Sequence, residues 1–216
     1  MAKKTPKKAA KKKPAPDKVD LFALHKDEYA MPKTPQLVTV GKGRYLVIEG
    51  AGRPGGDSFQ AAIGALYSIA WTIKMTKKFA GEGDFKVCPL ECLYWTAEGK
   101  CGDVPLDEFS WRLMIRIPDF VKAADLRKAA KTLKEKGKTE PVDAVKIGTL
   151  AEGRCAQVLQ VGPYEKAGET AALLQEFAGG QGLAFNGPYH EIYLSDPRRV
   201  APERLRTIAR VPVGRA

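Results

Sequence analysis

The hydrophobic and polar positions along the first half of the chain predict a strand, a helix and two further strands. The first strand is expected at 44–52, and the later ones in "FKVCPLECLYWTA" and "SWRLMIRIPDFV". Asp57 or Ser58 is the expected N-cap of the helix between them. The apolar residues of that helix recur every three or four positions, as on one buried face; they are Phe59, Ile63, Leu66, Ile69, Ala70 and Ile73.

The second half repeats the order of the first. A strand in "RCAQVLQVGPYEK" precedes a helix in "AGETAALLQEFAGGQG", which Gly179 and Gly180 are expected to end. Strands in "GPYHEIYLSDP" and "LRTIARVPV" follow. The expected fold class is therefore α+β: a duplicated β-α-β-β module with pseudo-two-fold symmetry. Its antiparallel sheet would carry helices on one face and leave a ligand cleft on the other.

Domain boundaries follow from the same pattern. We expect one domain over 19–216, with a first half at about 38–121 and a second half at about 141–216. The connector at about 122–140 has the pattern of a basic amphipathic helix with solvated lysines. Before the first half, the chain is interrupted by prolines and is expected to be an irregular lead-in.

Charge is concentrated at the N-terminus. Of the formal net charge of +11, residues 1–18 hold eight lysines and one aspartate, which leaves +4 for the remaining chain. A segment of Lys, Ala and Pro cannot bury a core, so a disordered tail is expected. The tail either aids solubility or makes a weak, nonspecific contact with nucleic acid. With no run of about 18 apolar residues and no secretory signal, we expect no membrane contact and a cytoplasmic location.

The four cysteines are expected to be free thiols. Four residues of strand span about 13 Å, whereas a disulfide needs Cα atoms within about 7 Å, so Cys88 and Cys92 cannot bridge along one strand. With Cys101, Cys155 and only two histidines, the chain predicts no metal site and no cofactor. The Gly-rich "GAGRPGG" fits neither common phosphate-binding pattern and is interpreted as a turn.

Two glutamates interrupt apolar, strand-like runs: Glu91 in "CPLECLYW" and Glu191 in "GPYHEIYLSDP". Side chains alternate between the faces of a strand. Tyr189, Glu191 and Tyr193 therefore share one face, which we expect to line the cleft. His190 shares the other face with Ile192 and Leu194, which we expect to pack under the helices. Glu91 and Glu191 are expected to occupy equivalent positions in the two halves.

The first-half strand gives a second set of candidates. Glu91 and Trp95 share a face, Tyr94 takes the other, and Trp111 on the next strand can join either wall. A carboxylate among aromatic rings attracts a flat cation, or acts as a general base where burial raises its pKa. The alternative is a glutamate that points to water or pairs with Arg112 or Arg116.

Several motifs in order resemble the GyrI-like small-molecule-binding proteins: "PLECLYW", "SWRLMIRIPDFV", "PVDAVKIGTLAEG", "VLQVGPYEKAGETAALLQEF" and "GPYHEIYLSDPRRVAPERLRTIARVPV". The resemblance covers roughly 20–216. It implies a duplicated α+β domain whose cleft binds hydrophobic, often cationic or aromatic compounds. In related transcription regulators the module follows a helix-turn-helix domain. The residues before it here are too few and too lysine-rich for one, so the chain resembles a stand-alone member.

Some stand-alone members that share "HEIYLSDPR" hydrolyse cyclopropane-bearing, DNA-alkylating natural products with a strand glutamate and aromatic residues. The resemblance implies Glu191 as the general base and Tyr193 beside it. The family often has Gly and Trp where this chain has Cys92 and Tyr94. We expect a ligand-binding wall that comprises Glu91, Trp95, Trp111, Tyr189 and Tyr94.

The sequence leaves two functions open: a detoxifying hydrolase, and a drug-binding, sequestering or effector-sensing module without catalysis or its own DNA-binding domain. A third, a nucleic-acid-associated accessory protein, rests on the lysine tail alone.

Overall fold

The protein is described by a computed structural model at residues 17–96, 105–138 and 140–216. Two halves of like order make up most of it. The first comprises β2 (Gln36–Ala51), α2 (Asp57–Ala80), β4 (Leu90–Trp95) and β5 (Ser110–Arg116). The second comprises β6 (Lys146–Val161), α4 (Ala167–Gly180), β8 (Tyr189–Tyr193) and β9 (Arg206–Arg215). The remaining α-helices and strands are β1 (Lys18–Val19), α1 (Leu21–Leu24), β3 (Asp84–Phe85), α3 (Ala123–Glu135) and β7 (Leu183–Phe185).

The main sheet is antiparallel and closes on itself. Its strand order is β6-β2-β5-β4-β8-β9-β7, and β6 also pairs with β9. The strands β2, β5 and β4 of one half thus correspond to β6, β9 and β8 of the other, which confirms the duplicated α+β fold. Ring closure was not foreseen. It follows from the length of β2 and β6, which have 16 residues each and bend far enough to pair with two neighbours.

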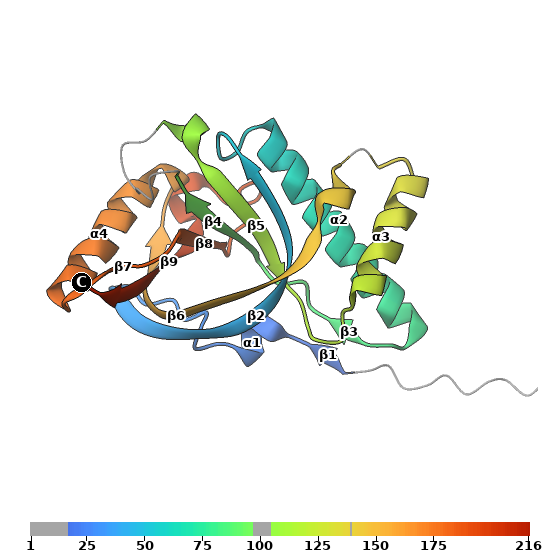
Figure 1. Ribbon diagram of the computed structural model, residues 1–216, viewed down its shortest axis with the longest axis horizontal. Coiled ribbons are helices and arrows are strands. Elements are labelled where there is room, and N and C mark those ends of the chain that lie inside the picture. Colours follow the sequence, from blue (N-terminus) through green and yellow to red (C-terminus); the bar gives the residue numbers. More distant parts are fainter. Residues whose placement is uncertain (1–16, 97–104, 139) are drawn as a thin grey trace, which may run out of the picture.

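Helices α2 and α4 pack on the outside of this ring, with the strands between them (Figure 1). The predicted stripe of α2 is confirmed: Phe59, Leu66, Ile69, Ala70 and Ile73 are buried, and Ile63 packs partly buried against them. The burial of this stripe is what attaches the helix to β2 and β5.

The helix ends differ slightly from prediction. The N-cap of α2 is Gly56, without a side-chain cap, and Asp57 is already helical. The chain reverses through Gly55, whose φ of 83° is a left-handed conformation that favours glycine. That turn places the cap one residue before Asp57 and two before Ser58, the two expected positions. At the end of α4, Gly180 is the last helical residue and Gln181 is the C-cap.

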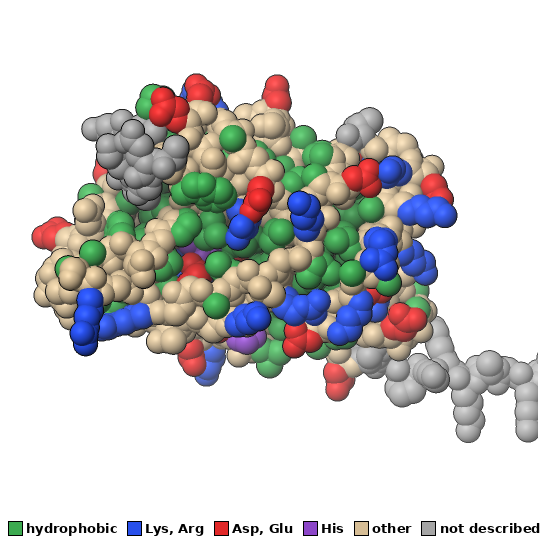
Figure 2. Space-filling model, viewed as in Figure 1, with side chains coloured by type: hydrophobic (Ala, Val, Ile, Leu, Met, Phe, Trp, Pro, Cys, Tyr) green, Lys and Arg blue, Asp and Glu red, His purple; other side chains and the backbone are tan. Residues whose placement is uncertain are grey.

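The connector forms α3 as expected, and it packs on α2 through the buried Ala129 and Leu133. Its basic side chains remain exposed. Lys and Arg side chains are visible over this helix and along the lower margin of the molecule (Figure 2).

Residues 17–32, called here the N-terminal segment, contain β1 and α1, which were not expected, whereas 25–32 form turns and irregular chain as predicted. β1 pairs with β3 in parallel, so Lys18 of the predicted tail lies in a strand; residues 1–16 fall outside the described chain. Tyr29 is buried in a cluster with Ile192 and Ile208. The segment therefore packs against the inside of the ring.

Cys88, Cys92 and Cys155 are free and buried, whereas Cys101 lies outside the described residues. Cys88 precedes β4 and does not lie on it. Across the described part of the chain, side chains form no cluster that could hold a metal ion. No described helix has both the length and the apolar character to cross a membrane.

Candidate functional site

Strand register decides which candidate side chains meet. Directly opposed residues of an antiparallel pair lie on the same face. Glu191 is opposite Cys92, and Tyr189 is opposite Tyr94, whereas Glu91 is opposite Ile192. Glu91 and Glu191 therefore point to opposite faces of the sheet, and the expectation that they occupy equivalent positions is wrong.

The face of Glu191 is the one that carries the helices. Cys92, Tyr94, Trp111 and Tyr189 belong to the same buried cluster as the inward residues of α2 and α4. We call this the outer face. His190 and Ile192 point to the inner face, inside the ring. The prediction that they pack under the helices, with Glu191 on the face opposite the helices, is therefore wrong. The alternation of side chains predicts which residues share a face of the strand. It does not predict which face the helices cover, because that depends on packing elsewhere in the fold.

A short chain of hydrogen bonds lies at the centre of the outer face. Glu191 is 5% exposed. The hydroxyl of Tyr193 donates to Glu191 Oε2 at 2.7 Å, and the hydroxyl oxygens of Tyr94 and Tyr193 are 2.6 Å apart. Burial raises the pKa of Glu191, the Tyr193 hydrogen bond and the His190 charge oppose that rise, and the result is about 7. This carboxyl is therefore poised to exchange a proton near neutral pH.

Aromatic rings from both halves surround these groups. Phe59 stacks on Tyr94 at 6.4 Å and meets Trp111 edge-on at 5.2 Å. Phe109 packs edge-on against Tyr94 at 6.3 Å, and Tyr164 against Tyr193 at 5.6 Å. Together they define the aromatic cluster: Phe59, Tyr94, Phe109, Trp111, Tyr164 and Tyr193.

Sequence reasoning missed three of these rings. Phe59 was identified only as a core residue of α2. Phe109 and Tyr164 lie in segments just before β5 and α4. Nothing in their local pattern indicates a site, because each reaches the outer face through the tertiary fold.

The inner face holds a buried network of charges. Glu91 is 0% exposed. It accepts a hydrogen bond of 2.7 Å from the Tyr29 hydroxyl. His190 Nε2 lies 3.2 Å from Glu91 Oε2, an ion-pair distance without the alignment of a hydrogen bond. The other ring nitrogen of His190 is 3.0 Å from Glu152, which also accepts from Arg210 at 2.7 Å.

These contacts settle the charge of His190. Burial alone disfavours an imidazolium, but the carboxylates of Glu152 and Glu91 outweigh it and raise the His190 pKa to about 9. Burial likewise opposes the ionisation of Glu152, yet His190 and Arg210 hold its pKa at about 2. His190 and Glu152 are therefore both ionised at neutral pH.

The N-terminal segment completes this inner network. Arg116 donates to the carboxylate of Glu28 at 2.6 Å, and Arg210 donates to the backbone oxygen of Glu28. Arg112 instead pairs with Glu49. Glu91 therefore neither points to water nor pairs with Arg112 or Arg116. The inner network comprises Glu28, Glu91, Arg116, Glu152, His190 and Arg210.

Trp95 also lies on the inner face, partly buried against Tyr45, Leu93 and Met114. The structure thus brings one set of the predicted residues together on the outer face and leaves Glu91 and Trp95 on the inner face. The outer set comprises Tyr94, Trp111, Tyr189, Glu191 and Tyr193.

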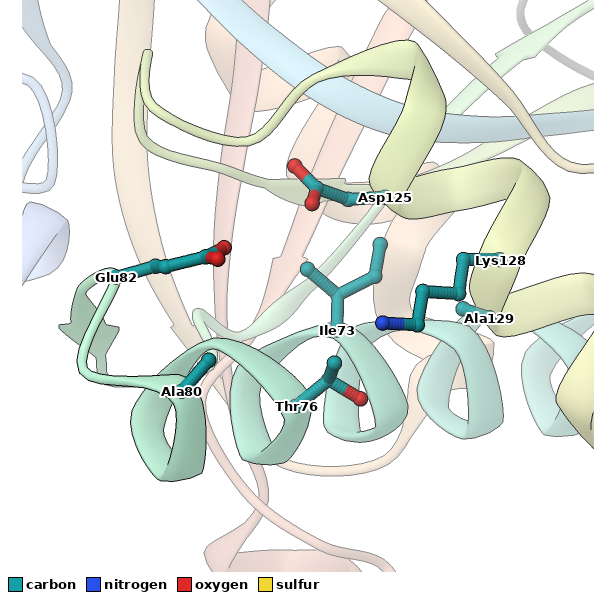
Figure 3. A pocket seen from close by; sticks show the side chains of 7 residues that line it. All are labelled: Ile73, Thr76, Ala80, Glu82, Asp125, Lys128 and Ala129. Atoms are coloured by element: carbon teal, nitrogen blue, oxygen red, sulfur yellow. The ribbon is translucent and has the colours of Figure 1, made fainter.

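A small recess lies elsewhere, between α2 and α3 (Figure 3). Glu82, Asp125 and Lys128 line it together with Ile73, and its volume is about 50 Å³. That is room for a water molecule or two, not for a drug-sized ligand. A larger, open recess of about 490 Å³ lies along α3 and is lined by Leu126, Arg127 and Val142 among others. Neither recess contains a buried carboxylate beside aromatic rings, so the aromatic cluster around Glu191 is the candidate site.

The fold and this cluster define a class: small-molecule-binding domains built from two β-α-β-β halves. The chain belongs to the GyrI-like family, whose small molecule binding domain matches residues 33–213. A comparison with curated protein sequences gives no significant match.

Solved structures agree with this assignment. An uncharacterized conserved protein from Listeria innocua is 36% identical with a TM-score of 0.84, and the alignment covers 91% of this chain and 100% of that one. A hydrolase from Listeria innocua is 36% identical with a TM-score of 0.82, over 92% and 100% of the two chains. The C-terminal domain of EcmrR is similar in fold alone, with 10% identity, a TM-score of 0.57, and coverage of 85% and 98%.

Proposed function

We propose that this protein binds flat, hydrophobic molecules, cationic or aromatic, against the aromatic cluster, and that it hydrolyses a cyclopropane-bearing alkylating compound there with Glu191 as general base. The observation that carries the proposal is the Glu191 carboxyl: buried, hydrogen-bonded to Tyr193, and with a pKa of about 7. The similarity to a hydrolase from Listeria innocua supports the catalytic part.

The aromatic rings and the carboxylate make different contributions to binding. Rings offer flat apolar area, and a cation over an aromatic face gains about 0.5–2 kcal/mol. A carboxylate in a site with little water adds an attraction that bulk solvent would weaken. Tyr164 and Tyr193 are only partly buried, so they mark the side from which a ligand reaches Glu191.

The proposed reaction adds water across a strained ring. Glu191 accepts a proton from a water molecule, and the water oxygen forms a bond to a ring carbon while a carbon–carbon bond of the cyclopropane breaks. The electrons of that bond pass into the conjugated system of the substrate, which takes up a proton from solvent. Tyr193 orients the carboxylate, because its hydroxyl proton is committed to Glu191.

Binding without turnover, as a sequestering or effector-sensing module, is the second candidate. The observation that favours it is the 5% exposure of Glu191, which leaves little room for an attacking water. The family description, a small molecule binding domain, is also one of binding.

The test is incubation of wild-type protein and Glu191→Gln with ethidium, as a flat cation, and with a panel of cyclopropane-bearing alkylators. Fluorescence follows binding, and mass spectrometry follows ring-opened product. We expect Glu191→Gln to lower turnover by about 10²–10⁴, the usual contribution of a general base, and to retain neutral ligands. Glu176→Gln, an exposed site on α4, is the matched control.

Ethidium binding without any product would leave the non-catalytic module as the function. Equal turnover and equal ethidium affinity in Glu191→Gln and wild type would remove Glu191 from the site altogether.

A further inference from the structure

The hydrogen-bonded groups at the centre of the outer face come from both halves of the fold. Tyr94 lies on β4, whereas Glu191 and Tyr193 lie on β8. The hydroxyl oxygens of Tyr94 and Tyr193 are 2.6 Å apart, and the Tyr193 hydroxyl is 2.7 Å from Glu191 Oε2. Tyr94 is therefore connected to the carboxylate through one intermediate hydroxyl.

Proton counting fixes the direction of this chain. An ionised carboxylate only accepts hydrogen bonds, so the single hydroxyl proton of Tyr193 goes to Glu191. The Tyr193 oxygen must then accept its hydrogen bond from Tyr94. Once Glu191 ionises, the Tyr193 proton points to Glu191 and the Tyr94 proton points to the Tyr193 oxygen.

Packing holds the ring of Tyr94 in the orientation that this chain requires. Phe59 stacks on it with an interplanar angle of 13°, and Phe109 meets it edge-on at 88°. The residue is 8% exposed. A phenol confined by two rings loses little further freedom when its hydroxyl binds a neighbour.

We propose that Tyr94 is a positioning residue: it acts through Tyr193 to orient and stabilise the ionised carboxylate of Glu191. A hydroxyl that accepts a hydrogen bond becomes a stronger donor in turn, so donation from Tyr94 strengthens the bond from Tyr193 to Glu191. The proposal rests on the proposed function, in which Glu191 is the working carboxylate, but its test needs no ligand.

Three other groups lie near Glu191 and bear on this test. Cys92 lies directly opposite on β4, Tyr164 packs on the Tyr193 ring, and His190 on the inner face contributes a positive charge. Cys92 also shares a side-chain hydrogen bond with Tyr94, so only the part of the shift that disappears in a Tyr193→Phe background reports the hydrogen-bond chain.

The experiment is an NMR titration of the Glu191 side-chain carboxyl in ¹³C-labelled protein, with the signal assigned by its loss in Glu191→Gln. We expect Tyr94→Phe to raise the Glu191 pKa by roughly 0.3–1 unit, because the ionised form loses support. Tyr193→Phe removes the direct donor and should raise it further. Tyr45→Phe, a buried phenol on the inner face, should leave the titration unchanged.

A double-mutant comparison separates positioning from a general packing effect. If Tyr94 acts through Tyr193, Tyr94→Phe has no additional effect on the Glu191 pKa in a Tyr193→Phe background. An equal shift in both backgrounds, or no rise in the single variant, would overturn the proposal. Because the titration is done without ligand, that result is distinct from a failure of ethidium to bind.

A stronger hydrogen-bond donor at position 94 should change the Glu191 pKa in the opposite direction. It also provides a test that remains valid if the Phe variant misfolds. A 3-fluorotyrosine at position 94 is a more acidic phenol of nearly the same size, and it should lower the Glu191 pKa. An unchanged or raised pKa in that protein would also contradict the proposal.

Discussion

Glu191 and His190 are adjacent in the chain, yet the two faces of β8 give them opposite preferences for a proton. Glu191 is buried with one hydrogen-bond donor, so its ionised form is disfavoured and its pKa rises to about 7. His190 lies between Glu152 and Glu91, so its protonated form is favoured and its pKa rises to about 9. The ionised carboxyl reduces the free energy of unfolding, and the protonated imidazole increases it.

The raised pKa of Glu191 predicts that Glu191→Gln gains stability over the wild type as pH rises. The folded state binds the Glu191 proton more tightly than the unfolded state, so the contribution of Glu191 to stability falls as pH rises from about 4.5 to about 7. A shift of that size corresponds to ~3 kcal/mol. The quantity to follow is the free energy of unfolding of Glu191→Gln minus that of the wild type. This difference should be larger at pH 8 than at pH 4 by up to this amount. Urea melts at both pH values measure it, and a pH-independent difference would contradict the buried, uncompensated carboxylate.

The raised pKa of His190 predicts a loss of stability in a different pH range. Its folded pKa lies above the unfolded value of 6.5, so its contribution is complete below pH 6.5 and is lost as pH rises through about 9. His190→Gln should be less stable than wild type at pH 6, because Glu91 and Glu152 lose the charge between them, and the difference should shrink by pH 10. Thermal melts between pH 6 and 10 report this, and a constant difference would mean that His190 is neutral in the folded protein.

At the scale of elements, the N-terminal segment behaves as part of the domain although it precedes the family match at residue 33. Tyr29 donates to Glu91, and Glu28 accepts from Arg116. Gln157 on β6 donates to the backbone oxygen of Ala30. Each contact gives a buried polar group inside the ring a hydrogen-bond partner from this segment.

Removal of the Tyr29 hydroxyl should therefore be costly. Tyr29→Phe leaves the Glu91 carboxylate with one donor fewer, and we expect a loss of about 1–3 kcal/mol in the free energy of unfolding. Tyr164→Phe, at a partly exposed ring of the outer face, should change it by less than about 0.5 kcal/mol. Equal urea midpoints for the two variants would show that the Tyr29 contact contributes nothing to stability.

At the scale of the whole molecule, the basic charge is unevenly placed. Residues 1–16, ahead of the described chain, hold seven of its lysines and no acidic residue, while the aromatic cluster lies on the outer face of the sheet. A polycation of this kind attracts phosphate backbones by counterion release. The tail and the candidate site are therefore expected to act independently.

Deletion of residues 1–16 tests this independence. The truncated protein should keep the melting temperature and the ethidium affinity of the full chain, because β1 begins at Lys18. Its retention of duplex DNA at low salt should weaken, with a shallower dependence on salt concentration. A fall in melting temperature would show that the tail packs on the domain, and unchanged DNA retention would show that the tail makes no such contact.

Much of the fold could be predicted from the sequence because the signals involved are local. The spacing of Phe59, Leu66, Ile69 and Ile73 follows the helix period, and the order β-α-β-β appears twice in the pattern. The full lengths of β2 and β6 and the short β7 were missed. Their residues extend into segments rich in Gly and charged side chains, where pairing with a neighbouring strand, rather than intrinsic preference, decides the conformation.

By itself, the sequence determined which side chains share a face: Tyr189, Glu191 and Tyr193 on one, His190 and Ile192 on the other. This holds because the two-residue period of a strand is a property of the backbone. Only the tertiary structure decided that α2 and α4 cover the Glu191 face, that the strands close into a ring, and that Tyr29 reaches Glu91 across 62 positions of the chain. Those outcomes depend on which surfaces bury each other's apolar area and satisfy each other's charges, and such contacts join residues that no local pattern links.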